Sequence, residues 1–220
     1  YADVRSHDSG GYRLLFNYIR RLGENANHKK FLRIYREEHL QIGKRSRRKE
    51  RRFDRIKSEE PKGINERWSM DFMYDVLENK RSYRILNVID DHNRECLCCE
   101  VSRSFGGYDV AEALEKLISR YGKPKVIKSD NGAEFRRRYM EKWSKERGIT
   151  LEFTRPGKPT ENGQIESFNG TMRNELLRGI EFESVREARA ELEKWREKYN
   201  NERPHSALNY EPPSTRRRPH

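Results

Sequence analysis

The sequence predicts an α/β protein with a mixed five-stranded sheet and flanking helices, preceded by a small helical domain. Strand patterns begin only after about residue 65, where three successive strands lead into an alternation of helices and strands. The first forty residues carry helical periodicity alone, and a basic run separates the two parts. We therefore expect a helix-turn-helix-like domain in residues 1–42, a basic linker in 43–60, the sheet domain in 61–180, and a C-terminal helix with a basic tail in 181–220.

Residues 10–40 have the apolar spacing of two short helices. Gly23 ends the first helix, and Asn27 is placed to cap the second. Two helices joined by a short turn are typical of a helix-turn-helix that binds DNA. A plain helical hairpin packed on the main domain fits the same pattern, and the sequence leaves both alternatives open.

Positive charge is the strongest compositional feature. Lys and Arg total 48 against 36 Asp and Glu, a net charge of +12, and such a surplus favours a polyanionic partner because phosphate neutralisation releases counterions. Nine of the fourteen residues in 44–57 are basic, a composition that cannot build a core. We interpret the segment as an arm that contacts DNA phosphates, with a solvated tether as the alternative. Its candidate contacts are Arg45, Arg47, Arg48, Lys49, Arg51 and Arg52.

The sheet domain divides into strands and helices by the period of its apolar residues. Three strands joined by tight turns come first, followed by a helix, a strand, a helix, a strand and two more helices. The expected segments, in this order, are Trp68–Leu77, Tyr83–Ile89, Cys96–Val101, Tyr108–Tyr121, Val126–Ser129, Glu134–Arg147, Thr150–Phe153, Glu161–Arg178 and Ser184–Tyr199.

Several classes of protein and site are excluded. No apolar stretch approaches a membrane span and no signal peptide is visible. The three cysteines, Cys96, Cys98 and Cys99, suit neither a disulfide framework nor a zinc site, so we expect buried, reduced residues in a cytoplasmic protein. No glycine-rich nucleotide loop is present. The chain begins at Tyr1 without methionine, which we interpret as a fragment or a processed form.

Three acids draw attention as a set. Asp71 lies inside the first strand, Asp130 ends the fourth, and Glu166 borders the apolar stripe of a late helix. Each has an ordinary interpretation: a solvent-facing strand residue, a turn residue and an exposed helix residue. Phosphodiester chemistry, however, uses two divalent ions about 3.5–4 Å apart, and Mg²⁺ or Mn²⁺ prefers oxygen ligands. Together the acids predict a two-metal site.

The spacing and the surrounding residues resemble a known family. Thirty-five residues separate Asp130 from Glu166, which is similar to the D,D(35)E signature of retroviral integrases and related insertion-sequence transposases. The local sequences WSMDF around Asp71, SDNGAEF around Asp130, PGKP at 156–159, ESFNG from Glu166, and YNNERPHSAL at 199–208 resemble the catalytic polypeptide of frameshifting bacterial insertion sequences. The resemblance covers nearly the whole chain.

The resemblance implies a ribonuclease H-like fold for residues 61–180, with the first strand beside the fourth and Glu166 close to both aspartates. It implies cleavage of DNA at transposon ends and strand transfer with two Mg²⁺ or Mn²⁺ ions, held by Asp71, Asp130 and Glu166. The implied partners are the terminal inverted repeats and target DNA, bound by a homodimer or larger oligomer in the bacterial cytoplasm, at the nucleoid. Arg173 is the main candidate for a DNA contact, with Lys158 and Asn169 as further candidates.

Two features depart from the family pattern. Relatives usually carry an additional N-terminal helix-turn-helix and zipper that are not visible here, and Glu161 stands where glutamine is common. We interpret Asp90 and Asp91 as the start of a turn, and His205 as a packing residue. The alternatives to a transposase are a nuclease of the ribonuclease H superfamily and a DNA-binding regulator without catalysis.

Overall fold

The computed structural model describes residues 11–41, 60–130, 138–154 and 162–217. Several predictions lie outside these ranges. They concern Lys158, Glu161, the first part of the helix expected from Glu134, and the whole basic arm with its six candidate contacts, Arg45, Arg47, Arg48, Lys49, Arg51 and Arg52.

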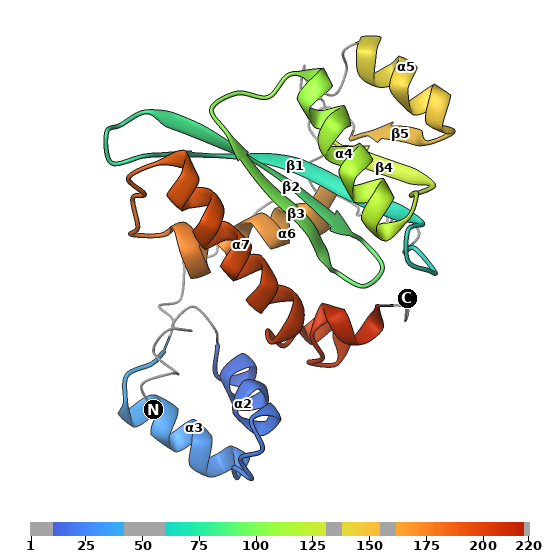
Figure 1. Cartoon of the computed structure of the whole chain (residues 1–220). Coiled ribbons are helices and arrows are strands. Elements are labelled where there is room, and N and C mark those ends of the chain that lie inside the picture. Colours follow the sequence, from blue (N-terminus) through green and yellow to red (C-terminus); the bar gives the residue numbers. More distant parts are fainter. Residues whose placement is uncertain (1–10, 42–59, 131–137, 155–161, 218–220) are drawn as a thin grey trace, which may run out of the picture.

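The predicted five-stranded mixed sheet is confirmed (Figure 1). Its strand order is β3-β2-β1-β4-β5, with antiparallel pairing from β1 through β3 and parallel pairing of β4 with β1 and β5. The first strand therefore lies beside the fourth, as the resemblance implied. The strands are β1 (Arg67–Val76), β2 (Ser82–Asp90), β3 (Cys96–Ser102), β4 (Val126–Ser129) and β5 (Thr150–Phe153).

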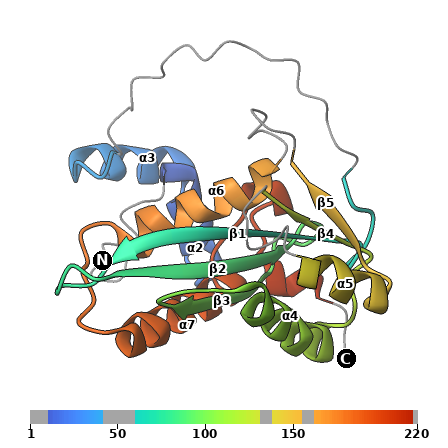
Figure 2. The ribbon, with the colours of Figure 1, turned by 90° about the horizontal axis from the view of Figure 1, so that it is seen from above.

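Helices cover both faces of the sheet because side chains along each strand alternate between the faces. Trp68 and Met70 of β1 pack in one core with α4 (Gly107–Tyr121) and α5 (Arg138–Arg147). Met73 of the same strand joins the opposite core with α6 (Gly163–Met172) and α7 (Val185–Asn201). Figure 2 shows β1, β2 and β3 side by side with helices on either side of them.

The helix that carries Glu166 differs from its prediction. Instead of one α-helix it consists of α6 followed by a π-helical turn, η2 (Arg173–Leu177). The buried apolar residues of this helix are Ile165, Phe168, Met172 and then Leu177, whereas Leu176, which continues the regular helical spacing, is only partly buried. The spacing of five between Met172 and Leu177 matches the i→i+5 period of a π-helix, so the wider turn brings Leu177 into the core.

The N-terminal helix pair forms as predicted. It comprises α2 (Tyr12–Arg21) and α3 (His28–Glu37), and the Asn27 side chain caps α3 by accepting from the N–H groups of Lys29 and Lys30. An ion pair of 3.0 Å between Arg21 and Glu211 links the pair to the C-terminal tail. The helix-turn-helix function remains a prediction, as do the proposed domain boundaries.

The edge strand β3 is closed by polar side chains of α7. Asn200 accepts from the backbone N–H of Cys96 at 2.9 Å and donates to its carbonyl at 2.8 Å. Arg189 donates to the carbonyl of Val101 at 2.8 Å. These bonds satisfy main-chain groups that an edge strand otherwise leaves open.

Two of the three cysteines are buried as predicted, whereas Cys98 is only partly buried. Cys96, Cys98 and Cys99 are free thiols, and the first and last are buried. Among the helices in the described ranges, none has the length and apolar character needed to cross a bilayer.

We predict that Asn200→Ala lowers the free energy of unfolding by about 1–3 kcal/mol, because it leaves the buried N–H of Cys96 without an acceptor. Urea unfolding measures the change. The neighbouring exposed Asn201 bonds only within its own helix, so Asn201→Ala is a matched control that stays within about 0.5 kcal/mol of the parent. Equal effects of the two substitutions would contradict the role of Asn200.

Candidate active site

The pairing of β1 with β4 brings Asp71 and Asp130 together. The parallel register aligns Ser69 with Lys128, and two residues further along each strand stand Asp71 and Asp130. Asp130 directly follows the last residue of β4 and is exposed, whereas Asp71 lies within β1 and is partly buried. Two acids from neighbouring strands therefore lie together at the carboxyl end of β4, and binding sites of α/β proteins commonly form at the carboxyl ends of strands.

Asp71 points to the face of the sheet that α6 covers. Asn169 of that helix donates from Nδ2 to Asp71 Oδ2 at 2.8 Å, and the backbone N–H of Phe72 donates to Asp71 Oδ1 at 2.9 Å. Both oxygens of the carboxylate are thus held by a donor. Glu166 precedes Asn169 by three residues on the same helix, and residues at that spacing share one helix face.

The pKa of Asp71 reflects the negative charges of the other two acids. Burial raises this pKa most, Asp130 adds to the rise and Glu166 adds a smaller effect, which gives a net value of about 6. The hydrogen bonds from Phe72 and Asn169 oppose this rise. Partial burial also raises the pKa of Glu166. Negative charge is therefore concentrated around the Asp71 carboxylate.

The donor set suits a hard divalent cation, but the acids are not closed around one. Among the described residues, no three His, Cys, Asp or Glu side chains gather closely enough to enclose an ion. Carboxylate oxygens are the preferred ligands of Mg²⁺ and Mn²⁺, and a divalent ion would relieve the repulsion that raises the pKa of Asp71. Asp71, Asp130 and Glu166 are the described residues that would supply such oxygen ligands.

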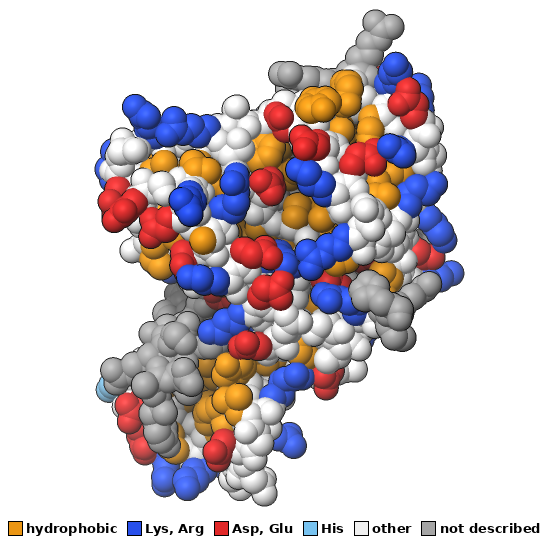
Figure 3. All heavy atoms as spheres, in the orientation of Figure 1, with side chains coloured by type: hydrophobic (Ala, Val, Ile, Leu, Met, Phe, Trp, Pro, Cys, Tyr) orange, Lys and Arg blue, Asp and Glu red, His pale blue; other side chains and the backbone are white. Residues whose placement is uncertain are grey.

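The residues expected to contact DNA have other partners in the structure. Asn169 is bonded to Asp71. Arg173 donates to the carbonyl of Tyr74 at 2.8 Å and pairs with Asp75 at 3.3 Å, although its side chain stays half exposed. A phosphate contact by either residue remains a prediction. On the face seen in Figure 3, Lys and Arg are interspersed with Asp and Glu and form no single patch among the described residues.

Asp90, Asp91 and His205, which we interpreted from the sequence as structural, have structural partners. Asp90 accepts from the backbone N–H of Asn65 at 2.7 Å and of His92 at 2.8 Å, and Asp91 pairs with Arg67. The turn interpretation of both aspartates is confirmed. His205 is buried against the Tyr199 ring with centroids 4.6 Å apart, and burial lowers its pKa to about 3. It packs, as predicted.

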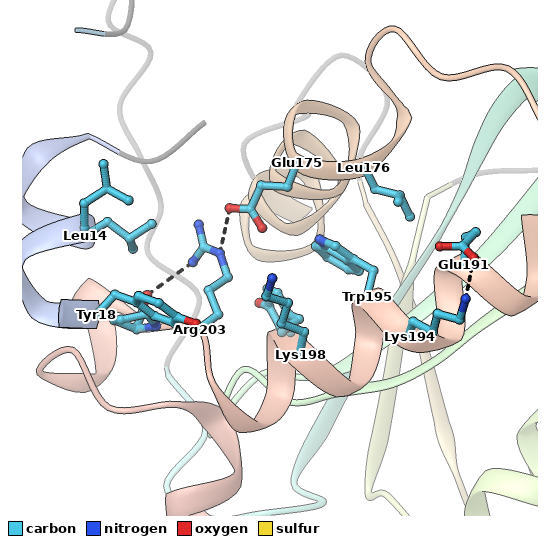
Figure 4. Close-up of a pocket in the computed structure, with 12 residues that line it drawn as sticks. Leu14, Tyr18, Glu175, Leu176, Glu191, Lys194, Trp195, Lys198 and Arg203 are labelled. Atoms are coloured by element: carbon cyan, nitrogen blue, oxygen red, sulfur yellow. Dashed lines mark hydrogen bonds and ion pairs between the residues drawn. The ribbon is translucent and has the colours of Figure 1, made fainter. Parts of the chain in front are cut away.

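A cleft of about 240 Å³ lies elsewhere, between the N-terminal helix α2 and helix α7 (Figure 4). Leu14, Leu176 and Trp195 contribute apolar walls, and the Arg203–Glu175 pair, 2.8 Å apart, lies within it. It contains none of the three acids. The concentration of negative charge, and not this cavity, marks the candidate site, since an exposed site suits a macromolecular substrate better than a small pocket.

Sequence reasoning missed the full environment of Asp71. Asn87 of β2 donates to Asn169 Oδ1 at 2.8 Å and so belongs to the same hydrogen-bonded group. The only signal in the sequence is one asparagine within the otherwise apolar run from Ile85 to Ile89.

Comparisons with known proteins agree with this fold. The Integrase core domain matches the chain twice, over residues 61–159 and 147–213. An insertion element IS407 protein of 31.7 kDa from Burkholderia multivorans is 41% identical over 93% of this chain and 74% of its own length. An insertion element IS476 protein from Xanthomonas euvesicatoria is 37% identical over 96% of this chain and 61% of its own length. A putative transposase for element IS150 of Escherichia coli is 25% identical over 92% of this chain and 78% of its own.

Solved structures share the fold at low sequence identity. The HTLV-2 integrase catalytic core domain in complex with magnesium aligns with a TM-score of 0.56 and 17% identity, over 70% of this chain and 96% of its own. A chain of the simian T-cell lymphotropic virus intasome aligns with a TM-score of 0.63 and 15% identity, over all of this chain and 74% of its own. These likenesses confirm the ribonuclease H-like architecture.

We predict that Asp71 titrates near pH 6 in the metal-free protein and that Asp130→Asn lowers this pKa, since it removes a negative neighbour. Carboxyl ¹³C NMR measures both values. Because the folded pKa exceeds the ordinary aspartate pKa of 3.8, ionisation destabilises the fold, and the free energy of unfolding falls as pH rises from about 4 through about 6. Asp109→Asn, on α4, is the control. An Asp71 pKa that Asp130→Asn leaves unchanged would contradict the proximity of the two acids.

Proposed function

The chain belongs to the integrase core domain family and is a transposase of the insertion-sequence type, and we propose that it cuts and rejoins DNA with metal ions held by Asp71, Asp130 and Glu166. As a DDE-type polynucleotidyl transferase it acts on the phosphodiester bonds of DNA. Beyond the family, we propose that these three residues hold two metal ions and that the reaction includes strand transfer.

The observation that carries the proposal is the electrostatic coupling of Asp71 with Asp130 and Glu166. A carboxylate held among like charges is stabilised by a bound cation. The family is metal-dependent, and the related HTLV-2 integrase core was solved with magnesium. Two bound Mg²⁺ or Mn²⁺ ions would supply activation of the attacking oxygen and stabilisation of the leaving oxygen.

Each side chain has a distinct part in this proposal. Asp71 is held in place by hydrogen bonds from Asn169 and the Phe72 N–H. It is the rigid metal ligand of the set, on the central strand β1. Asp130 and Glu166 are exposed and approach the substrate from the end of β4 and from α6. Neither supplies a covalent nucleophile: a water attacks phosphorus to free a 3′ end, and that 3′-hydroxyl then attacks the target strand, so a P–O bond forms as another breaks.

The partners follow from charge and from the relatives. A net charge of +12 suits double-stranded DNA, both the terminal inverted repeats and the target. The simian virus relative was solved in an intasome, and we propose a homodimer or larger oligomer on DNA here. A bacterial cytoplasmic location, at the nucleoid, accompanies this proposal.

We predict that Glu166→Gln abolishes joining of labelled transposon ends in the presence of Mg²⁺ or Mn²⁺. Loss of a ligand that contributes several kcal/mol to the transition state lowers the rate roughly a thousandfold. The matched control is Glu112→Gln, which changes an exposed glutamate of α4, the helix that packs on the opposite face of the sheet from α6, and leaves joining intact.

Other outcomes separate the alternatives. Cleavage without joined products in the parent protein identifies a nuclease of the ribonuclease H superfamily. DNA binding with no products in either protein identifies a non-catalytic regulator. Joining that survives in Glu166→Gln would falsify the assignment of Glu166 to the metal site.

A further inference from the structure

Asn87 is a polar residue in an apolar setting. It lies in β2 directly across from Asp71 in the antiparallel register. Its neighbours Leu86 and Val88 are fully buried, and Asn87 itself has 0% exposure. A side chain in this position cannot reach DNA or solvent, so any effect on the reaction passes through its neighbours.

Two successive hydrogen bonds connect Asn87 with the Asp71 carboxylate. Asn87 Nδ2 donates to Asn169 Oδ1 at 2.8 Å, and Asn169 Nδ2 donates to Asp71 Oδ2 at 2.8 Å. The Asn169 amide therefore accepts a hydrogen bond from β2 through its oxygen and donates one to β1 through its nitrogen. With both ends engaged, the amide has one orientation, the one that offers a donor to Asp71.

The carbonyl oxygen of Asn87 does not stabilise the fold. Asn87 Oδ1 is buried and has no hydrogen-bond partner among the described residues. A buried carbonyl without a partner destabilises a protein, and an apolar side chain of similar size avoids that cost. Asn87 Nδ2 provides the donor to Asn169 and a longer contact of 3.8 Å to the Met172 sulfur, and leucine would provide neither hydrogen bond.

We propose that Asn87 is a positioning residue of the active site: it fixes the amide of Asn169, which in turn holds the Asp71 carboxylate ready for the metal. This inference rests on the proposed function of Asp71. Partners that orient metal-ligating carboxylates typically change metal affinity or activity by 10–100-fold when they are removed. Asn87 acts at one remove, through Asn169.

The test compares Asn87→Leu, Asn169→Ala and the double variant in the full chain. In the metal-free protein, the side-chain ¹⁵N–H signals of Asn169 are expected to exchange with solvent faster in Asn87→Leu than in the parent. Mn²⁺ affinity, measured by calorimetry, is expected to fall roughly 10–100-fold, and kcat for joining to fall with it. The KM for DNA stays unchanged because Asn87 is buried.

The double variant distinguishes positioning from a general structural role. Once Asn169 is alanine, Asn87→Leu should change Mn²⁺ affinity by less than about twofold, since its effect passes through Asn169. Asn93→Ala is the control: this buried asparagine of the β2–β3 turn bonds to Glu95, and its loss should alter stability without altering Mn²⁺ affinity.

Two results would overturn the inference: Mn²⁺ affinity and Asn169 exchange that match the parent in Asn87→Leu, or additive effects in the double variant. Failure of the proposed function has a different signature, because the parent protein would then make no joined products and bind no Mn²⁺ at Asp71. The exchange of the Asn169 amide in the metal-free protein still decides the role of Asn87 in that case. If Asn87→Leu does not fold, unchanged Mn²⁺ affinity in Asn169→Ala overturns the inference.

Discussion

The parallel pairing of β1 with β4 is the constraint on which the candidate site depends. It sets Asp71 opposite the position that Asp130 occupies at the end of β4, and strand pairing leaves little freedom in that alignment, because a shift of one residue would move every side chain of β1 to the other face. The buried Trp68 and Met70 fix the face, and Asp71 is thereby directed to α6. The same residues that stabilise the sheet therefore determine where the carboxylate points.

The ionised carboxylate of Asp71 lowers the stability of the protein, and packing elsewhere in the fold offsets this loss. Burial and two negative neighbours raise the pKa of Asp71 to about 6, so near neutral pH the ionised carboxylate is destabilising. Cores on both faces of the sheet and the closed edge at β3 compensate. Such unfavourable charge is common at functional sites, where a ligand relieves it.

The sequence predicted the elements well because their signals are local. Short apolar or alternating runs located the five strands, and the capping side chain of Asn27 indicated the start of α3. The neighbourhood of β1 and β4 came from the family resemblance, since no local signal encodes which strands pair. Each of the three acids has an ordinary interpretation by itself. Only the chemistry that they could share, and the family spacing, marked them as one site.

What the sequence could not predict depends on tertiary contacts. The π-helical turn η2 follows from the packing of Leu177, which a regular helical stripe does not contain. Arg173 was expected to be available for DNA, yet its partners Asp75 and Tyr74 lie almost a hundred residues away. Asn87 and Asn169 are separated by 82 positions, so their hydrogen bond leaves no trace in sequence spacing.

The central claim is that Asp71, Asp130 and Glu166 together hold divalent ions. Anomalous diffraction from crystals of the protein soaked in Mn²⁺ tests it most directly, because the positions of the ions are observed independently of activity. The account predicts two anomalous peaks beside Asp71, one toward Asp130 and one toward Glu166, and their loss in Asp71→Asn. Peaks confined to other acids, such as Asp90 and Asp91, or no peak near Asp71 at saturating Mn²⁺, would contradict it.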